Sequence, residues 1–229
     1  MSFKKFLSEL NGKGIEGELI KTILYSLITS FLVLGILYFL KFKNITDFIP
    51  KYGFYLFFSA LSYALIMPTI RQIRAYKELP CMSGMMVGMT TGMISGFLPG
   101  FYVASTNGMF IGGFFGAALG IIIGIYNGKC CRIMGAMEGV MAGFMGGLMG
   151  AMTAFMLFTD NLKIAAVIVF IIGAIIMTGL NYMVYKDGRE LERKLIESQF
   201  ITIWVTFLLI SITTWLVVFG PRSAIFNSS

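Results

Sequence analysis

The sequence predicts an all-α, polytopic integral membrane protein with about seven transmembrane helices. First, 57% of the residues are hydrophobic and only 13% are charged, whereas in soluble domains roughly a quarter of the residues are charged. Second, the mean hydropathy is +0.84. Third, charges and turn formers interrupt the apolar runs at regular intervals. A chain of 229 residues accommodates about seven spans of about 20 residues, each long enough to cross roughly 30 Å of hydrocarbon.

The first 18 residues predict an amphipathic segment that lies on the membrane surface. Phe3, Phe6, Leu7 and Leu10 recur at helical spacing, and charged residues lie off that stripe. The segment lacks the continuous apolar core of a secretory signal. A frayed polar terminus is the alternative interpretation.

Residues 19–229 are expected to form a single membrane domain. The breaks between its apolar runs carry turn formers, charges or both. The runs predict helices at 19–40, 52–70, 82–104, 108–127, 133–158, 163–185 and 199–219.

The distribution of basic residues predicts the orientation. Thirteen of the 18 Lys and Arg residues fall on the side that holds the N-terminus, and five fall on the other side. Because cytoplasmic loops are enriched in Lys and Arg, we expect a cell-membrane protein with a cytoplasmic N-terminus. The same rule accounts for the net charge of +7 without a nucleic-acid partner.

Glycine recurs every four residues through the segment 81–158, which we expect to form a Gly/Met-rich core bundle. Small residues at this spacing let helix backbones approach closely in lipid, where the hydrophobic effect does not drive association. These glycine zippers predict an inner bundle of the third, fourth and fifth spans, wrapped by the other four. The fourth span either is gripped along its length by neighbours or also packs against its copy in a homo-oligomer. The ladders are Gly84, Gly88, Gly92 and Gly96, then Gly108, Gly112, Gly116, Gly120, Gly124 and Gly128, then Gly135, Gly139, Gly143 and Gly147.

Methionine follows the same four-residue spacing on two of these spans. Thirteen of the 17 methionines lie between residues 82 and 156, and twelve of them are on the third and fifth spans. These two spans run in the same direction, so their methionine columns can stand side by side and line a path across the membrane. The alternative is packing, since methionine fills irregular gaps such as those beside glycine.

The cysteines favour a metal-binding interpretation. All three lie at the predicted cytoplasmic ends of the methionine-bearing spans, and histidine is absent from the sequence. Thiolates and thioethers are the soft ligands that select Cu(I) over hard cations. Conduction of an ion also requires several successive binding sites that are weak enough to release it. The candidate metal ligands are Cys81, Met82, Met85, Met86, Met89, Met93, Cys130, Cys131, Met134, Met137, Met141 and Met145.

Glu138 is the one acidic residue well inside a predicted span. A carboxylate at such a depth is costly and is by default a functional candidate. It can hold a cation, relay a proton or neutralise a metal–thiolate site. The alternative is an ion pair with Lys129 or Arg132 near the interface.

The combination of MxxxM with GxxxG between residues 81 and 96 resembles the Ctr-type copper transporters. In that family, thioethers form a selectivity filter and glycines pack the neighbouring helices. The resemblance implies a Cu(I) filter at Met85, Met89 and Met93. It covers about 16 residues, and this chain departs from the three-span family in having seven predicted spans.

The expected function is therefore transport or buffering of a soft metal ion, with Cu(I) as the best match. Two alternatives stay open. One is a structural or assembly protein whose glycine zippers mediate helix packing or oligomerisation, and the other is a channel for another small solute or ion. We expect no enzymatic activity, because the sequence offers no nucleophile with an adjacent base.

Overall fold

A computed structural model describes residues 15–39, 52–76, 80–129, 132–187 and 199–221 of the chain. Over these residues it contains seven helices that are long and apolar enough to cross a membrane. The predicted all-α membrane fold is thereby confirmed. The helices are α2 (Ile15–Leu37), α3 (Phe54–Ala75), α4 (Cys81–Asn107), α5 (Met109–Gly128), α6 (Arg132–Met156), α7 (Leu162–Asp187) and α8 (Phe200–Phe219).

The predicted boundaries agree with the helices to within a few residues. The predicted interfacial segment lies outside the described residues up to residue 14, and the apolar part of α2 runs Leu19–Leu37. α5 is 20 residues long, which corresponds to about 30 Å and is enough to cross the hydrocarbon core. α4 and α5 are separated by Gly108 alone, whose φ of 109° is accessible to glycine but strained for other residues.

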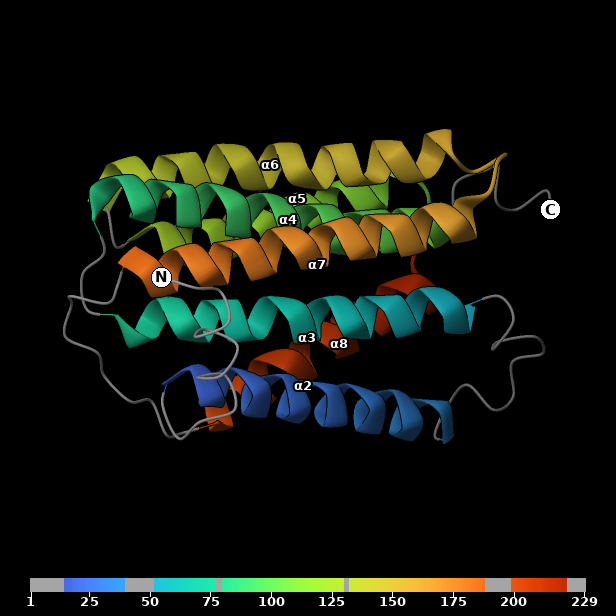
Figure 1. Ribbon diagram of the computed structural model, residues 1–229. Coiled ribbons are helices and arrows are strands. Elements are labelled where there is room, and N and C mark those ends of the chain that lie inside the picture. The colour runs from blue at the N-terminus through green and yellow to red at the C-terminus, as the bar shows by residue number, and fades with distance from the viewer. Residues whose placement is uncertain (1–14, 40–51, 77–79, 130–131, 188–198, 222–229) are drawn as a thin grey trace.

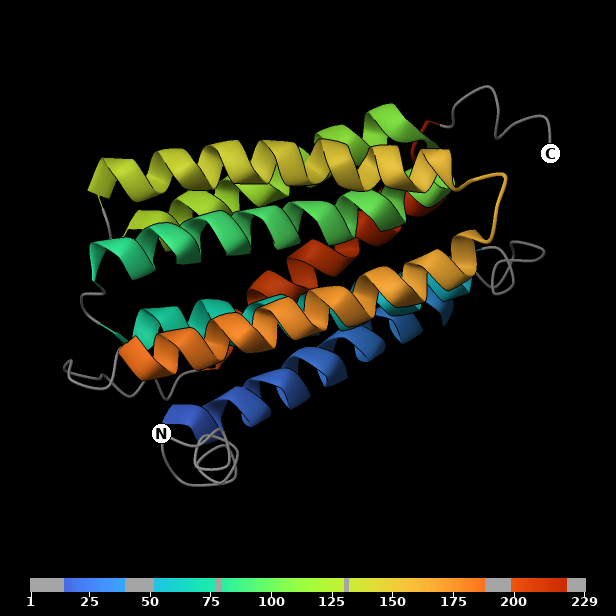
Figure 2. The same ribbon diagram turned by 45° about the horizontal axis from the view of Figure 1, so that its top comes forward.

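Six of the described helices form two groups that meet at α3 and α4, and α7 contacts both of these helices (Figures 1 and 2). α4, α5 and α6 pack against one another on one side of the molecule, and α2 packs against α3 and α8 on the other. α3 and α4 are the two central helices, since each contacts five others. α3 contacts α2, α4, α5, α7 and α8, and α4 contacts α3, α5, α6, α7 and α8. We call the end of the bundle where α4 begins the Cys81 end and the opposite end the Asn107 end.

Polar side chains join the helices around α3 and α4. The Tyr63 hydroxyl of α3 lies 2.7 Å from the Thr213 hydroxyl of α8. The Gln72 side-chain amide donates to the carbonyl of Asn181 on α7 at 3.0 Å. The Asn107 side-chain amide donates to the carbonyl of Leu216 on α8. Because hydrocarbon offers polar groups no alternative partner, such bonds fix which helix faces meet.

The glycine ladders form the contact surface of α4, α5 and α6. All fourteen ladder glycines are buried. A methyl group placed on Gly92 of α4 would lie 2.9 Å from the carbonyl oxygen of Gly139 on α6 and 3.2 Å from Cα of Gly124 on α5. The three backbones therefore touch directly. α5 is in contact with α4 and α6 along its length, as the first of the two possibilities for the fourth span predicts.

The arrangement differs from the prediction in one respect, because the group of three is not wrapped by the other four helices. α6 packs against α4 and α5 and leaves its far side uncovered by the described part of the chain (Figure 1). The reason is that α3, α7 and α8 reach the group of three mainly through α4 and do not pack on α6. One long face of α6 is consequently on the outside of the molecule.

Candidate metal-handling surface

Glycine and methionine occupy opposite faces of α6. At about 100° per residue, the methionines of this helix fall within an arc of about 120°, and the ladder glycines lie on the other side. The glycine side is buried, whereas the methionines are between 44% and 66% exposed. The shared four-residue spacing thus reflects one helix with a packing face and an outward thioether face. The outward methionines are Met134, Met137, Met141, Met145, Met149, Met152 and Met156, and Ile133, Phe144, Leu148 and Phe155 of the same helix are also exposed.

The α6 methionines form an unbroken row. Each is three or four residues from the next, so every one is a surface neighbour of its successor, with about 5–6 Å between Cβ atoms. From Met134 to Met156 the row rises about 33 Å, close to the thickness of the hydrocarbon core. The candidate set chosen from the sequence stopped at Met145, although the same spacing continues through Met149, Met152 and Met156.

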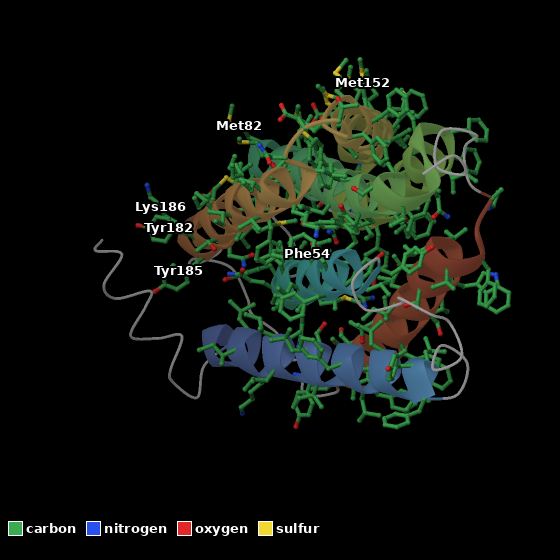
Figure 3. All side chains as sticks on the ribbon, turned by 90° about the vertical axis from the view of Figure 1, so that its right-hand side faces the viewer. Phe54, Met82, Met152, Tyr182, Tyr185 and Lys186 are labelled. Carbon is green, nitrogen blue, oxygen red and sulfur yellow. The ribbon has the colours of Figure 1, made fainter. Side chains whose placement is uncertain are left out.

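α4 adds methionines to the same side of the molecule near the Cys81 end. Met82, Met86 and Met89 are 80%, 53% and 50% exposed, whereas Met85 and Met93 are half-buried. Met93 is covered because Gly146 of α6 packs on its backbone, where an added methyl would lie 2.9 Å from the Met93 Cα. Figure 3 looks along the bundle from the Asn107 end and shows Met82 and Met152 pointing outward on the side opposite α2. We call the ten exposed methionines of α4 and α6 the methionine face.

Seven of the nine predicted methionine ligands therefore lie on the outer surface of one chain rather than around an interior path, and Met85 and Met93 are half-buried. The glycine backbones close the interface between α4, α5 and α6, so the glycine faces enclose no lumen there. Within one chain the exposed methionines do not fill gaps beside the glycines. Their side chains project away from the interface that the glycines make.

Outward-facing residues elsewhere have a different chemistry. The exposed large hydrophobic side chains of α7 are all isoleucines, and its Met177 is fully buried. Those of α8 are aromatic and branched aliphatic residues. Lipid contact alone therefore does not call for methionine in this chain. Exposure to lipid therefore does not explain why α6 has methionine on its outward face.

The predicted cysteine site is described only in part. Cys81 is exposed at the start of α4, while Cys130 and Cys131 lie outside the described residues. Their chain neighbours Lys129 and Arg132 are at the same end of the bundle, where α5 ends and α6 begins. Within the described ranges, no three His, Cys, Asp or Glu side chains are grouped as a metal site.

Glu138 lies at the edge of the α6 row. Its side chain is half-buried, and it is four residues after Met134 and three before Met141. These spacings make both methionines its surface neighbours on the helix. A carboxylate here would add negative charge beside a cation held by the thioethers.

Comparison with known proteins identifies no relative of this chain. No protein-family model matches the chain, and no curated protein or solved structure shows significant similarity to it.

Proposed function

We propose that this protein binds and transports or buffers a soft monovalent metal ion, foremost Cu(I), along the methionine face. The observation that carries the proposal is the unbroken thioether row on α6, which extends across the thickness of a membrane, whereas the exposed large hydrophobic side chains of α7 are isoleucines. Thioether sulfur is a soft ligand that suits Cu(I) and not Mg²⁺, Ca²⁺ or Mn²⁺.

The spacing of the row supports movement as well as binding. The methionine side chain has three rotatable bonds, so two neighbouring thioethers on one helix can converge on one ion. Each such pair shares a methionine with the next pair. An ion can then pass from pair to pair without leaving its ligands, and weak successive sites are what conduction requires.

A metal ion that moves along an outer face must be shielded from the lipid hydrocarbon by other protein groups. A second copy of the chain that packs its own methionine face against the first would enclose the row and supply further sulfurs for each ion. The glycine ladders are not available for this contact, because all are buried within one chain. We therefore place the homo-oligomer contact on the methionine face rather than on the glycine zippers.

The cysteines are the site at which the metal ion enters the path. With a cytoplasmic N-terminus, the Cys81 end faces a compartment that keeps thiols reduced. Cys81, Cys130 and Cys131 would then accept the metal as thiolates and deliver it to Met82 and Met134, the nearest methionines along α4 and α6.

A structural role is the second candidate. The direct backbone contact of the three glycine ladders accounts for glycine without any transport, and it would make α4, α5 and α6 a rigid unit for assembly. On this view the methionines are merely apolar, and leucine would serve equally well.

Measurement of bound copper under reducing conditions distinguishes the metal-handling role from the structural role. The full chain and a Cys81→Ser, Cys130→Ser, Cys131→Ser variant are purified, loaded with Cu(I) and washed, and the copper that remains is quantified. The proposal predicts stoichiometric Cu(I) in the native chain and a reduced content in the variant. Background copper in both proteins would contradict it.

Uptake of Cu(I) into proteoliposomes then tests movement. Replacing Met137, Met141 and Met145 with leucine keeps side-chain volume nearly constant and should reduce uptake towards that of protein-free vesicles. The matched control is Met109→Leu with Met177→Leu, one exposed and one buried methionine outside the face. Equal uptake by all three proteins would support the structural role.

A further inference from the structure

A second surface feature lies away from the methionine face, between α3, α5 and α8. It is a cavity of about 290 Å³ close to the Cys81 end. α3 and α5 end there, at Ala75 and Gly128, and α8 begins there, at Phe200. The cavity is therefore near the depth at which lipid headgroups meet the hydrocarbon core.

The cavity has a cationic end. Arg71 and Arg74 lie on the last two turns of α3, and both line it. Arg71 is only 8% exposed, whereas Arg74 is exposed and its guanidinium carbon lies 4.8 Å from the centre of the Tyr126 ring. That contact with the aromatic face holds the Arg74 side chain beside the opening. Among the described residues that line the cavity, none is acidic.

The remaining walls are apolar. Ile122 of α5 and Val205 of α8 line the cavity about one turn deeper into the membrane than Tyr126 and Ile201. Ile122 is 62% exposed and Val205 is 40% exposed, so the walls open towards the lipid. A ligand that fits must combine an anionic group at the boundary with a hydrocarbon portion that continues inward.

We propose that this cavity binds one acidic phospholipid, with its phosphate at Arg71 and Arg74 and the start of an acyl chain along Ile122 and Val205. Guanidinium groups match phosphate oxygens through paired, charge-assisted hydrogen bonds. Basic pockets between transmembrane helices commonly hold anionic headgroups. Charge complementarity selects an acidic lipid over a zwitterionic one, and the apolar walls select a lipid over free phosphate.

Native mass spectrometry of the detergent-purified full chain tests the assignment, with phosphatidylglycerol and phosphatidylcholine as probes. The native chain should retain phosphatidylglycerol in preference to phosphatidylcholine. Arg74→Gln should weaken phosphatidylglycerol retention by about tenfold, the loss expected for one charge-assisted hydrogen bond. Arg74→Lys, which keeps the charge without the paired geometry, should fall between the two.

The control is Lys163→Gln, which removes one positive charge at the Asn107 end of the bundle. It should leave phosphatidylglycerol retention unchanged. Arg74 is exposed, so its variant is expected to fold, and an unchanged thermal unfolding temperature would verify this. Val205→Trp fills the apolar wall without changing any charge and should also reduce retention.

Three results would overturn the proposal. They are unchanged retention in Arg74→Gln, an equal loss in Lys163→Gln, and displacement of the lipid by inorganic phosphate at comparable concentration. The last would mean that an anion suffices and that the apolar walls contribute nothing.

Discussion

Replacing Gly120 with alanine tests the packing of α4, α5 and α6 at its centre. A methyl group at this position would lie 2.8 Å from the Gly143 Cα, 2.8 Å from the Gly143 carbonyl oxygen and 2.8 Å from the Gly92 carbonyl oxygen. Ordinary van der Waals contact for such an atom is 3.4–4 Å. Because all three neighbours are backbone atoms of two different helices, no side-chain rotation relieves the overlap.

The expected cost follows from this geometry. α5 must move away from α4 and α6 by about half an ångström, and a gap of that size forfeits a quarter or more of each dispersion contact. Overpacking of this kind costs about 1–3 kcal/mol, and two immobile neighbouring helices favour the upper part of that range. The higher helix propensity of alanine offsets up to about 1 kcal/mol of this destabilisation. Gly120→Ala should therefore destabilise the chain by about 1–2 kcal/mol.

Gly179→Ala in α7 is the matched control. Nothing lies within 4 Å of a methyl group there, so the same chemical change should be neutral or stabilising by up to about 1 kcal/mol. The two variants should differ by about 2–3 kcal/mol, which corresponds to roughly 4–12 °C in the midpoint of thermal unfolding for a chain of this size. Thermal unfolding in one detergent measures the difference, and equal midpoints for the two variants would refute the close packing.

Two further predictions concern the connection between the helix groups and the orientation. In a double-mutant cycle, Tyr63→Phe and Thr213→Val should couple by about 1 kcal/mol, since both groups are buried and share one hydrogen bond of 2.7 Å; additive effects on the unfolding midpoint would contradict the bond. In a variant whose one cysteine is Cys81, which is exposed, a membrane-impermeant maleimide should label the protein only after the cells are permeabilised. Labelling of intact cells would reverse the proposed orientation.

Much of the fold could be predicted from the sequence because the membrane restricts the choices. Spanning segments must be helical, and their ends are marked by turn formers and charges, so the predicted fifth span at 133–158 differs little from α6, Arg132–Met156. The four-residue recurrence of glycine also predicted correctly which three helices contact each other most closely.

The direction in which the methionines face could not be predicted. Periodicity places Met141 and Gly143 on different sides of one helix, but it does not say what lies beyond either side. That depends on which helices pack against α6, and α3, α7 and α8 pack against α4 instead. The cavity beside Arg74 was missed for the same reason, because Tyr126 lies far from it in the sequence. Two arginines three residues apart at the end of a span were the only local signal.

The central claim is that the methionine face binds a soft metal ion. Its most direct test is a Cu(I) competition titration of the native chain, of a variant with all seven α6 methionines of the face changed to leucine, and of the Met109→Leu, Met177→Leu control. Leucine preserves the apolar, lipid-compatible character of the surface, so thermal unfolding should change little. The account predicts that the face variant binds fewer Cu(I) ions than the native chain and that the control binds as many. Equal Cu(I) binding by all three folded proteins would contradict it.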